Sequence, residues 1–281
     1  MRVTFGIRTA YTNRVFDLHN DFPTLLNGGE YAKYLSDNAE HSVVAVIFTS
    51  ELGASAEKRV AEIKDRLTAI NPAQPIAIED LGFLSDKTAA EMDFSDYFYC
   101  SLTWNHDNRF AGGALGSGRL TDCGKRLIES MNGRCAVDLA HLNRASFYDV
   151  LELSERPICS HTGFNAHPRS LDDAQVRALI GRRGIIGLCA VTAFTSAKTV
   201  GELAAVVDAF VQKHGVDHLC IGTDFCGTRD LPIGFKSYGD VDNFASALKR
   251  LGYADSDISG IFYDNAKRFY EEIQYARQRN L

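Results

Sequence analysis

The sequence lacks any run of about 20 consecutive apolar residues, the length that a membrane-spanning helix requires. Residues 1–15 contain no apolar stretch followed by a small-residue cleavage site, so we expect no secretory signal. Lysine and arginine form no block, and the formal net charge is −6. These absences argue against a membrane partner and against a nucleic-acid-binding surface.

The sequence also lacks a C-x-x-C pair, and its seven cysteines are odd in number. Five of them fall in segments that we expect to be buried strands, where a thiol behaves as a small hydrophobe. These five are Cys100, Cys135, Cys159, Cys189 and Cys220. The pattern favours a reducing compartment, and we expect a cytoplasmic protein.

Short apolar, β-branched runs alternate with amphipathic segments of helical length. Eight such runs predict strands, at residues 15–19, 42–49, 75–79, 97–104, 134–141, 157–161, 184–191 and 218–225. Near-continuous apolar strands are typical of a parallel sheet covered on both faces. A chain of 281 residues is long enough for a (β/α)8 TIM barrel, which needs about 250. We therefore expect one barrel domain spanning residues 1–281; the alternative is an open doubly wound sheet.

The segments between the strands predict helices at residues 55–70, 121–132, 170–181, 198–215 and 255–276. Thr121 and Ser170 stand at N-cap positions, where a hydroxyl can accept a hydrogen bond from a free helical amide. The glycine-rich stretch 111–120 has no strand leading into it and no helix opening from its glycines. It is therefore not a phosphate-binding loop, and we expect a mobile loop.

Imidazole and carboxylate side chains interrupt the expected strands at their C-terminal ends. The six residues are His19 and Asp21 (first strand), Glu79 (third), His141 (fifth), His161 (sixth) and Asp224 (eighth). In a barrel all C-terminal strand ends meet on one face, where barrel enzymes carry their chemistry. Residues two apart in an extended chain point the same way, so His19 and Asp21 share a direction.

Imidazole nitrogen and carboxylate oxygen suit zinc, and they also suit manganese, iron or cobalt. Six such ligands exceed what one tetrahedral catalytic zinc uses, so two divalent cations sharing a bridging carboxylate is the economical interpretation. Taken singly, each residue has a simpler explanation: a strand-end histidine is often only hydrogen-bonded, and Glu79 could pair with a surface lysine. The hypothesis depends on all six residues sharing one end of the barrel.

The remaining histidines divide into two sets. Three lie before or at the start of strands and are expected to be structural or solvated, namely His41, His214 and His218. His106 and His167 lie in loops above the expected site, where each would either contact substrate or be solvated.

Several segments in order resemble the renal (membrane) dipeptidase family, peptidase family M19, a branch of the amidohydrolase-like metal-dependent barrels. They are residues 17–23 (DLHNDFP), 137–141 (VDLAH), 156–161 (RPICSH), 167–169 (HPR), 222–225 (GTDF) and 264–265 (DN). The resemblance runs over nearly the whole chain. It implies a TIM barrel of the metal-dependent hydrolase type that holds two zinc ions.

The resemblance also implies roles for individual residues. His19 and Asp21 would bind one zinc, His141 and His161 the other, and Glu79 would bridge them. Asp224 would lie beside the bridging water as the catalytic carboxylate. Arg169 would bind the terminal carboxylate of the substrate, since its planar fork matches two oxygens; the alternative is a surface arginine that caps the next helix.

The sequence departs from the family in three places, of which one is Asp80, which follows Glu79 where glycine is common. Residues 102–104 read Leu-Thr-Trp where renal-type members have Leu-Thr-His, although Trp104 and Asn105 resemble a bacterial subgroup. The role of that histidine is either vacant or taken by His106. Cys226 stands where the family has aspartate, and it is expected to be a small loop residue or, less simply, a metal ligand. Trp104 would plug the barrel or form a pocket wall, and Asn105 would bind substrate or shape the loop.

The expected function is hydrolysis of dipeptides, including those with a C-terminal D-residue, by a hydroxide that bridges two zinc ions. Asp224 would take the proton of the water and pass it to the leaving amine, or else orient a ligand histidine. An alternative is hydrolysis of another small amide, a lactam or a lactone. Alternatives of other classes are a one-metal isomerase or lyase and a non-catalytic barrel that binds a metabolite. A homodimer is expected from the resemblance alone.

Overall fold

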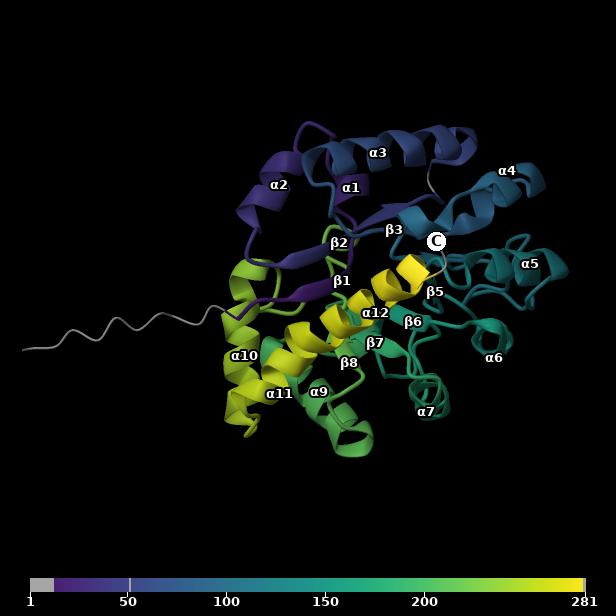
Figure 1. Ribbon diagram of the computed structural model, residues 1–281. Helices are drawn as coiled ribbons and strands as arrows, with labels where there is room; N and C mark the ends of the chain where they lie inside the picture. Colours follow the sequence, from purple (N-terminus) through teal and green to yellow (C-terminus); the bar gives the residue numbers. More distant parts are fainter. Residues whose placement is uncertain (1–12, 51, 280–281) are drawn as a thin grey trace, which may run out of the picture.

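A computed structural model describes residues 13–50 and 52–279 (Figure 1). Eight parallel strands close into a barrel in sequence order, and β1 pairs with β8 to complete it. The strands are β1 (Phe16–Asn20), β2 (Ser42–Phe48), β3 (Ile76–Glu79), β4 (Tyr99–Ser101), β5 (Ala136–Asp138), β6 (Pro157–Thr162), β7 (Ile185–Leu188) and β8 (Leu219–Ile221). The predicted TIM barrel is confirmed, and the open sheet is excluded.

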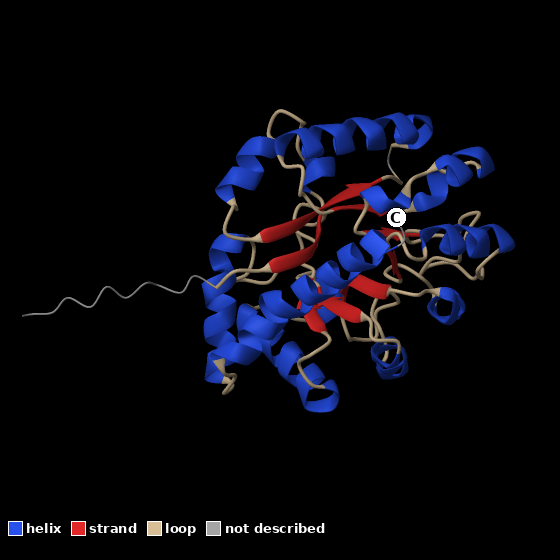
Figure 2. Cartoon of the chain, viewed as in Figure 1, coloured by secondary structure: helices blue, strands red, loops and turns tan. Residues whose placement is uncertain are grey.

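Helices surround the strands on the outside of the barrel (Figure 2). The α-helices are α1 (Phe22–Leu25), α2 (Tyr31–Asp37), α3 (Ala56–Ile70), α4 (Asp86–Glu91), α5 (Asp122–Met131), α6 (Arg144–Leu153), α7 (Asp173–Gly181), α8 (Thr192–Thr195), α9 (Val200–His214), α10 (Val241–Arg250), α11 (Asp255–Ser259) and α12 (Asn265–Arg279). Short 3₁₀ turns are η1 (Gly53–Ser55), η2 (Leu81–Phe83), η3 (Phe94–Asp96) and η4 (Tyr238–Asp240), and η5 (Gly260–Asp264) is a π-helical turn.

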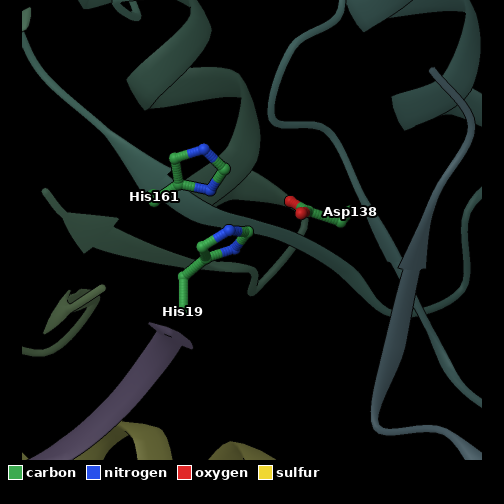
Figure 3. Close-up of side chains that lie close together, drawn as sticks. All are labelled: His19, Asp138 and His161. Atoms are coloured by element: carbon green, nitrogen blue, oxygen red, sulfur yellow. The ribbon is translucent and has the colours of Figure 1, made fainter. Parts of the chain in front are cut away.

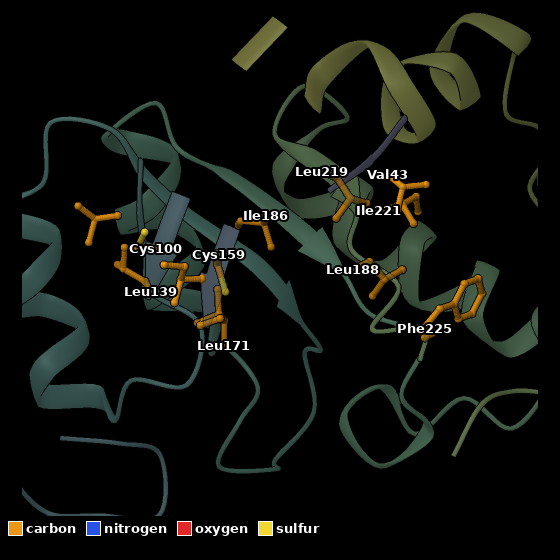
Figure 4. Packing of buried hydrophobic residues seen from close by; sticks show 14 of the residues in the cluster. Val43, Cys100, Leu139, Cys159, Leu171, Ile186, Leu188, Leu219, Ile221 and Phe225 are labelled. Carbon is orange, nitrogen blue, oxygen red and sulfur yellow. The ribbon is translucent and has the colours of Figure 1, made fainter. Parts of the chain in front are cut away.

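The apolar residues of each strand divide between two cores because successive side chains point to opposite faces. In β2, Val44 and Val46 belong to the smaller core inside the barrel, whereas Val43 and Ile47 belong to the larger core between strands and helices. Figure 4 shows part of the larger core. Both faces of the strands are therefore buried, which explains their near-continuous apolar sequence.

The C-terminal helix α12 lies across the barrel (Figure 1) and contributes to the smaller core. Phe269 and Tyr270 of α12 pack against Phe98, with ring centroids 6.3 and 5.0 Å apart, and Tyr270 also contacts Phe16. Phe98 precedes β4 and Phe16 opens β1, so α12 covers the N-terminal end of the barrel. The C-terminal strand ends at the other side are left for the site.

Helix boundaries agree with the expected ones at α3, α5 and α9. Thr121 caps α5 as predicted, accepting a hydrogen bond from the Gly124 amide at 3.1 Å. Ser170 does not cap α7: that helix begins later, and Asp172 forms a reciprocal capping box with Gln175. An aspartate at the N-cap accepts the amide hydrogen bond as well as a serine does, so composition alone did not place the boundary.

Other sequence predictions need correction. The expected helix 255–276 is interrupted by the π-helical turn η5 and ends at Arg279. The α-helices that were not predicted are α1, α2, α4, α6, α8 and α10. The expected strand 97–104 contains only the three residues of β4, so Trp104 lies in the following loop.

Within residues 13–50 and 52–279, no helix has the length and apolar character needed to cross a bilayer. The cysteines are free thiols, and the five expected to be buried are buried. Cys100, Cys159 and Cys220 lie in strands, whereas Cys135 directly precedes the first residue of β5 and Cys189 directly follows β7.

Candidate metal centre

Six imidazole and carboxylate side chains converge at the C-terminal end of the barrel. They are His19 in β1, Asp21 directly after β1, Glu79 at the end of β3, His141 after β5, His161 in β6 and Asp224 after β8. Five are buried and Asp224 is partly buried. Possible ligand atoms within this set lie within 4.8 Å of one another in two groups, one of His19, Asp21 and Asp224, the other of Glu79, His141 and His161.

The sequence predicted that His141 and Asp224 lie at the ends of their strands. The structure corrects this, because both residues lie beyond the strand ends. Strands β5 and β8 end at Asp138 and Ile221, and the chain then turns before it reaches either residue. His141 has φ 68° and Asp224 has φ 61°, a left-handed conformation that is uncommon for residues with a side chain. The turn, rather than the strand, therefore aims these two side chains into the site.

In the first group, main-chain pairing between the ends of β1 and β8 places Asp21 beside Asp224. The Asp224 amide donates to the His19 carbonyl at 3.0 Å, and the Asp21 amide donates to the Phe225 carbonyl at 2.9 Å. His19 Nε2 lies 3.6 Å from Asp21 Oδ2. Gly227 allows the close approach of the chain, because a Cβ there would lie 2.2 Å from an Asp21 oxygen.

In the second group, two imidazoles face one carboxylate oxygen. Glu79 Oε1 lies 2.8 Å from His141 Nε2 and 3.6 Å from His161 Nε2, and the two imidazole nitrogens are 3.1 Å apart. The other carboxylate oxygen, Glu79 Oε2, lies 3.8 Å from His19 Nε2 of the first group. Glu79 therefore stands between the two groups, with one oxygen facing each.

The buried polar atoms at this site that lack hydrogen-bond partners indicate that it fits divalent cations. Four buried side-chain nitrogen or oxygen atoms of the described residues lack a hydrogen-bond partner: His19 Nε2, Asp21 Oδ1, Glu79 Oε1 and Arg169 Nε. Burying a polar atom without a partner costs free energy, so unpartnered atoms are rare in native proteins. All four lie at this site, and three belong to the candidate ligands. Imidazole nitrogens and carboxylate oxygens are donors that zinc accepts.

Hydrogen bonds behind the imidazoles of His19 and His161 turn each Nε2 lone pair toward the site. The Tyr99 hydroxyl donates to the Leu18 carbonyl at 2.8 Å, so its oxygen accepts from His19 Nδ1 at 2.9 Å. The Ser160 hydroxyl donates to Asp138 Oδ2 at 2.6 Å, so its oxygen accepts from His161 Nδ1 at 2.9 Å. With hydrogen on Nδ1, each ring presents its Nε2 lone pair to the site.

Asp138 also lies near His19 and His161 in a third group of possible ligands (Figure 3). The Ser160 hydroxyl already lies between them, since its oxygen is 3.2 Å from His19 Nδ1 and 2.9 Å from His161 Nδ1. Asp138 is further held by the amides of Ser160 and Ala140 at 2.9 and 3.0 Å. Its oxygens are thus occupied, and Asp138 supports the two histidines rather than binding a cation.

Asp17 has the same arrangement on the other side of the barrel. It accepts hydrogen bonds from the Thr223 amide and hydroxyl at 2.8 and 2.6 Å, from the His19 amide at 3.2 Å and from the Tyr238 hydroxyl at 2.5 Å. Sequence analysis assigned no role to Asp17, Asp138 or their partners. The available signal was an aspartate inside an apolar strand, two or three residues before a candidate ligand histidine.

The pKa values of His19 and Glu79 are both shifted by their charged neighbours. Burial opposes protonation of His19, but Asp21 and Glu79 raise its pKa to about 10. Burial also opposes ionisation of Glu79, but His141 and His19 lower its pKa to about 2. The carboxylates therefore create a negative potential that a proton on His19 offsets, and a cation at the same place would serve the same purpose.

The second group and Asp224 show the opposite shifts. Burial, followed by the charge of Arg169, lowers the pKa of His141 to about 3. Burial, followed by His19, lowers the pKa of His161 well below its usual range. Burial and the neighbouring Asp21 raise the pKa of Asp224 well above its usual range. Neutral imidazoles are the form that binds metal, and a carboxylate of raised pKa is suited to holding a proton.

A cavity of about 520 Å³ opens above the two groups. The candidate ligands Asp21, Glu79, His141, His161 and Asp224 all contribute to its lining, together with the apolar side chains of Leu25, Phe48, Trp104, Val191 and Phe194. Trp104 forms a wall between Phe48 and His141, with ring centroids 5.1 and 5.9 Å away, and it is not a plug inside the barrel. Asn105 also lines the cavity, and its side chain contacts His141.

Arg169 lies close to the site but does not line this cavity. Its Nη2 is 2.8 Å from His161 Nε2, and its guanidinium carbon lies 5.3 Å from the ring centre of Phe194. It borders a neighbouring cavity of about 210 Å³, to which His141 and His167 also contribute. It does not cap α7, so the alternative interpretation as a surface arginine is wrong.

Of four other histidines, one is exposed and three have structural partners away from the metal centre. The side chain of His106 is exposed and does not line either cavity near the metal centre, so the structure does not bring it to the site. His41 and His218 hydrogen-bond to main-chain atoms of Val15 and Gly184, and His214 pairs with Asp173 at 2.9 Å. These last three have structural partners, as expected.

Cys226 lines the main cavity with φ 70° and is partly buried. Its Sγ lies 3.8 Å from the Tyr34 hydroxyl, and burial raises the pKa of the thiol to about 11. It is not part of any group of possible metal ligands among the described residues. A neutral thiol on a turn agrees with the simpler expectation of a small loop residue.

Solved structures share this barrel. One is a dipeptidase described as a metallopeptidase of family M19, with a TM-score of 0.81 and 18% identity over 92% of this chain and 98% of that chain. A second is a metallopeptidase from Rhodobacter sphaeroides bound to a phosphinate mimic of L-Ala-D-Ala, with a TM-score of 0.77 and 18% identity over 92% and 99% of the two chains. An amidohydrolase from Pseudomonas aeruginosa gives 0.67 and 17% over 92% and 87%.

Sequence comparisons give a family. An "uncharacterized protein in pqqA 5′ region" of Klebsiella pneumoniae is 27% identical over 191 residues, which cover 60% of this chain and 70% of that protein. Residues 91–281 match the membrane dipeptidase family, and this range contains His141, His161, Arg169 and Asp224. The other candidate ligands precede the match and are added by the fold. The chain belongs to the membrane dipeptidase family, peptidase family M19.

Proposed function

We propose that the protein hydrolyses dipeptides at a centre of two divalent cations, most simply zinc. The position of Glu79 carries the proposal, because its two oxygens face two separate groups of ligands at 2.8 and 3.8 Å from the nearest imidazole nitrogens. His19 and Asp21 would hold one cation, His141 and His161 the other, and Glu79 would contact both. Membership of the dipeptidase family and the apolar-walled cavity support a small peptide-like substrate.

When bound, the cations would polarise the amide carbonyl and bring the pKa of the attacking water close to neutral. Asp224 would accept a proton from that water as its oxygen bonds to the carbonyl carbon. The same proton then passes to the nitrogen as the carbon–nitrogen bond breaks, so the products are an amine and a carboxylic acid, which releases its own proton to solvent. Asp224 lies beside Asp21 and His19 and lines the cavity, so it is placed to hold that proton between the two steps.

The substrate's C-terminal carboxylate is assigned to Arg169. This arginine is buried, its Nε lacks a hydrogen-bond partner, and its guanidinium borders both His161 and the smaller cavity. A planar guanidinium binds a carboxylate through two parallel hydrogen bonds. The Rhodobacter sphaeroides neighbour binds a mimic of L-Ala-D-Ala, which supports testing dipeptides with a C-terminal D-residue on this chain as well.

The test is amine release from a panel of L,L- and L,D-dipeptides by zinc-loaded protein, with and without a chelator. We expect chelator-sensitive turnover of at least one dipeptide. The isosteric variant Asp224→Asn is expected to reduce turnover by about 10²–10⁴-fold, the usual contribution of a general acid–base group. It should still bind zinc, because Glu79, His19 and Asp21 remain.

No turnover of any dipeptide by protein shown to hold two cations would overturn the proposal. The result would favour another small amide, a lactam or a lactone as substrate. Turnover that survives complete removal of the metal would overturn the metal mechanism and leave the substrate class standing.

A further inference from the structure

The glycine-rich segment 111–118 takes no direct part in the metal centre, yet the structure fixes it closely. The carboxylate of Asp107 accepts hydrogen bonds from three of its amides, those of Gly113, Ser117 and Gly118, at 3.1, 3.1 and 2.8 Å. The Gly116 amide also donates to the Gly113 carbonyl at 2.9 Å. The sequence-based expectation of a mobile loop does not agree with these bonds.

This loop connects the chain after β4 to the chain after β5. The Leu115 amide donates to the Asn105 carbonyl, and the Ala114 amide donates to the His141 carbonyl, both at 2.7 Å. An isolated bridge between Gly113 and Leu142 adds a further connection. The loop therefore holds the main chain of Asn105 and that of His141 at a fixed separation.

Glycine is required where the loop touches its neighbours. A Cβ at Gly113 would lie 2.5 Å from the carbonyl carbon of Asn105 and from the carbonyl oxygen of Trp104. A Cβ at Gly112 would lie 2.2 Å from the Gly118 carbonyl oxygen. Real Cβ atoms do not approach main-chain atoms this closely, so any side chain here would push the Trp104–Asn105 segment away from His141.

This packing places Asn105 so that its side chain forms one hydrogen bond to a candidate ligand of the metal centre, His141. Asn105 Oδ1 lies 2.9 Å from His141 Nδ1. An amide oxygen can only accept, so the hydrogen is on Nδ1 and the Nε2 lone pair faces Glu79 Oε1 at 2.8 Å. His141 lies in a turn, with φ 68°, and its ring also contacts Trp104 and His161. Among the described residues, Asn105 Oδ1 is the atom that accepts from its Nδ1, so this bond sets which nitrogen carries the hydrogen.

We propose that Asn105 is a positioning residue for His141, and that Asp107 and the glycine-rich segment 111–118 exist to hold Asn105 in place. The inference rests on the proposed function, because His141 is taken as a ligand of one cation. It goes beyond that function by assigning to Asn105 a role in cation affinity rather than in substrate binding. Loss of such a hydrogen bond behind a ligand histidine typically weakens metal binding by about 10–100-fold.

The test is titration of metal-free protein with Zn²⁺ against a chromophoric chelator, which gives the affinity of each site without any substrate. Asn105→Ala is expected to weaken one of two sites by about 10–100-fold and to leave the other within about threefold. Asn105→Asp restores an oxygen acceptor for Nδ1 and is expected to recover most of the affinity. Leu115→Ala is the matched control: it removes an exposed side chain of the same loop and keeps the amide that donates to Asn105.

A second variant tests the support of Asn105. Asp107→Ala removes the acceptor of three loop amides and is expected to weaken the same site as Asn105→Ala, but less. Unfolding temperatures and far-ultraviolet circular dichroism of each variant show that the barrel is intact.

Equal cation affinities in Asn105→Ala and the unchanged protein would overturn the inference, and so would an equal loss at both sites. Binding of no cation by the unchanged protein would overturn the proposed function and this inference with it. A weaker site in Asn105→Ala with unaltered unfolding temperature, together with recovery in Asn105→Asp, would establish it.

Discussion

His19 and His161 differ from His141 in the part of the fold that supplies the hydrogen-bond acceptor for Nδ1. The partners of His19 and His161 are the hydroxyls of Tyr99 and Ser160, which lie in strands β4 and β6 inside the barrel. The partner of His141 is Asn105, which lies in a loop. The first two imidazoles are thus fixed by the closed sheet itself, and the third by a loop that needs its own supporting carboxylate.

This difference predicts that the strand-borne supports of His19 and His161 and the loop-borne support of His141 should respond differently to mutation. Substitutions at strand hydroxyls and their carboxylates should alter both the stability of the barrel and metal binding, because those groups are buried in its interior. Substitutions at Asn105 and at Asp107, which supports it, should alter metal binding and leave the stability of the barrel unchanged. Glu79 belongs to the second group and also faces His19 of the first, so its substitution should weaken cation binding more than any other single change.

Glu79→Gln is expected to produce the largest effect. The variant keeps the size of the side chain but removes the charge that faces both His19 and His141, so neither cation should be held tightly. Turnover should fall by about 10³-fold or more, because metal polarisation is worth several kcal/mol and each 1.4 kcal/mol is tenfold. Metal content by elemental analysis and dipeptide turnover measure the change. Glu91→Gln on the exposed face of α4 is the control.

Retention of one tightly bound cation in Glu79→Gln would show that one group of ligands is complete without Glu79. The two groups of ligands would then differ in whether they need Glu79 to hold a cation.

Asp138→Asn and Asp17→Asn are expected to have the next largest effects and to differ in kind. Each loses charge-assisted hydrogen bonds worth about 1.5–3 kcal/mol, so both should lower the free energy of unfolding by about that amount. Asp138 acts through Ser160 on both His19 and His161, so its variant should also weaken cation binding by about 10–100-fold. Urea unfolding and Zn²⁺ titration measure the two quantities.

Asp17 contacts the amide of His19 rather than its ring, so Asp17→Asn should change cation affinity much less than Asp138→Asn. Equal losses of affinity in the two variants would contradict the assignment of Asp138 as the support of both imidazoles.

Tyr99→Phe is expected to have a smaller effect, at the other group from Asn105→Ala. His19 loses its 2.9 Å partner but keeps Ser160 Oγ at 3.2 Å, so affinity should fall by about tenfold at the low end of the usual range. The double variant with Asn105→Ala should show losses at two separate sites that add. If both single variants weaken the same site, the division of the centre into two groups is wrong.

The sequence predicted that the candidate ligands converge, because five of the eight apolar strand runs stop at an imidazole or a carboxylate and a barrel gathers those ends. It did not predict the supporting residues, since the partner of Asp17 is Thr223 after β8 and that of Asp138 is Ser160 in β6. Such pairs depend on which strands are neighbours, and closure of β8 onto β1 is a property of the whole chain.

The loop residues show a second limit of sequence reasoning. Trp104, Asn105 and His106 are consecutive, and sequence analysis treated all three as substrate-binding candidates. The direction in which a side chain points along an irregular loop cannot be derived from periodicity. Only the structure shows that Trp104 forms a cavity wall, Asn105 contacts His141 and His106 is exposed.

The smallest expected effect compares the first and last of these three residues. Trp104→Ala removes an aromatic wall of the cavity and should raise KM about fivefold, since an aromatic contact is worth on the order of 1 kcal/mol. His106→Ala should change KM by less than about twofold, because surface substitutions away from a site have small effects. Neither should alter Zn²⁺ affinity, unlike Asn105→Ala between them. A larger KM change for His106→Ala than for Trp104→Ala would mean that this loop rearranges when substrate binds, and that the sequence-based assignment of His106 was correct.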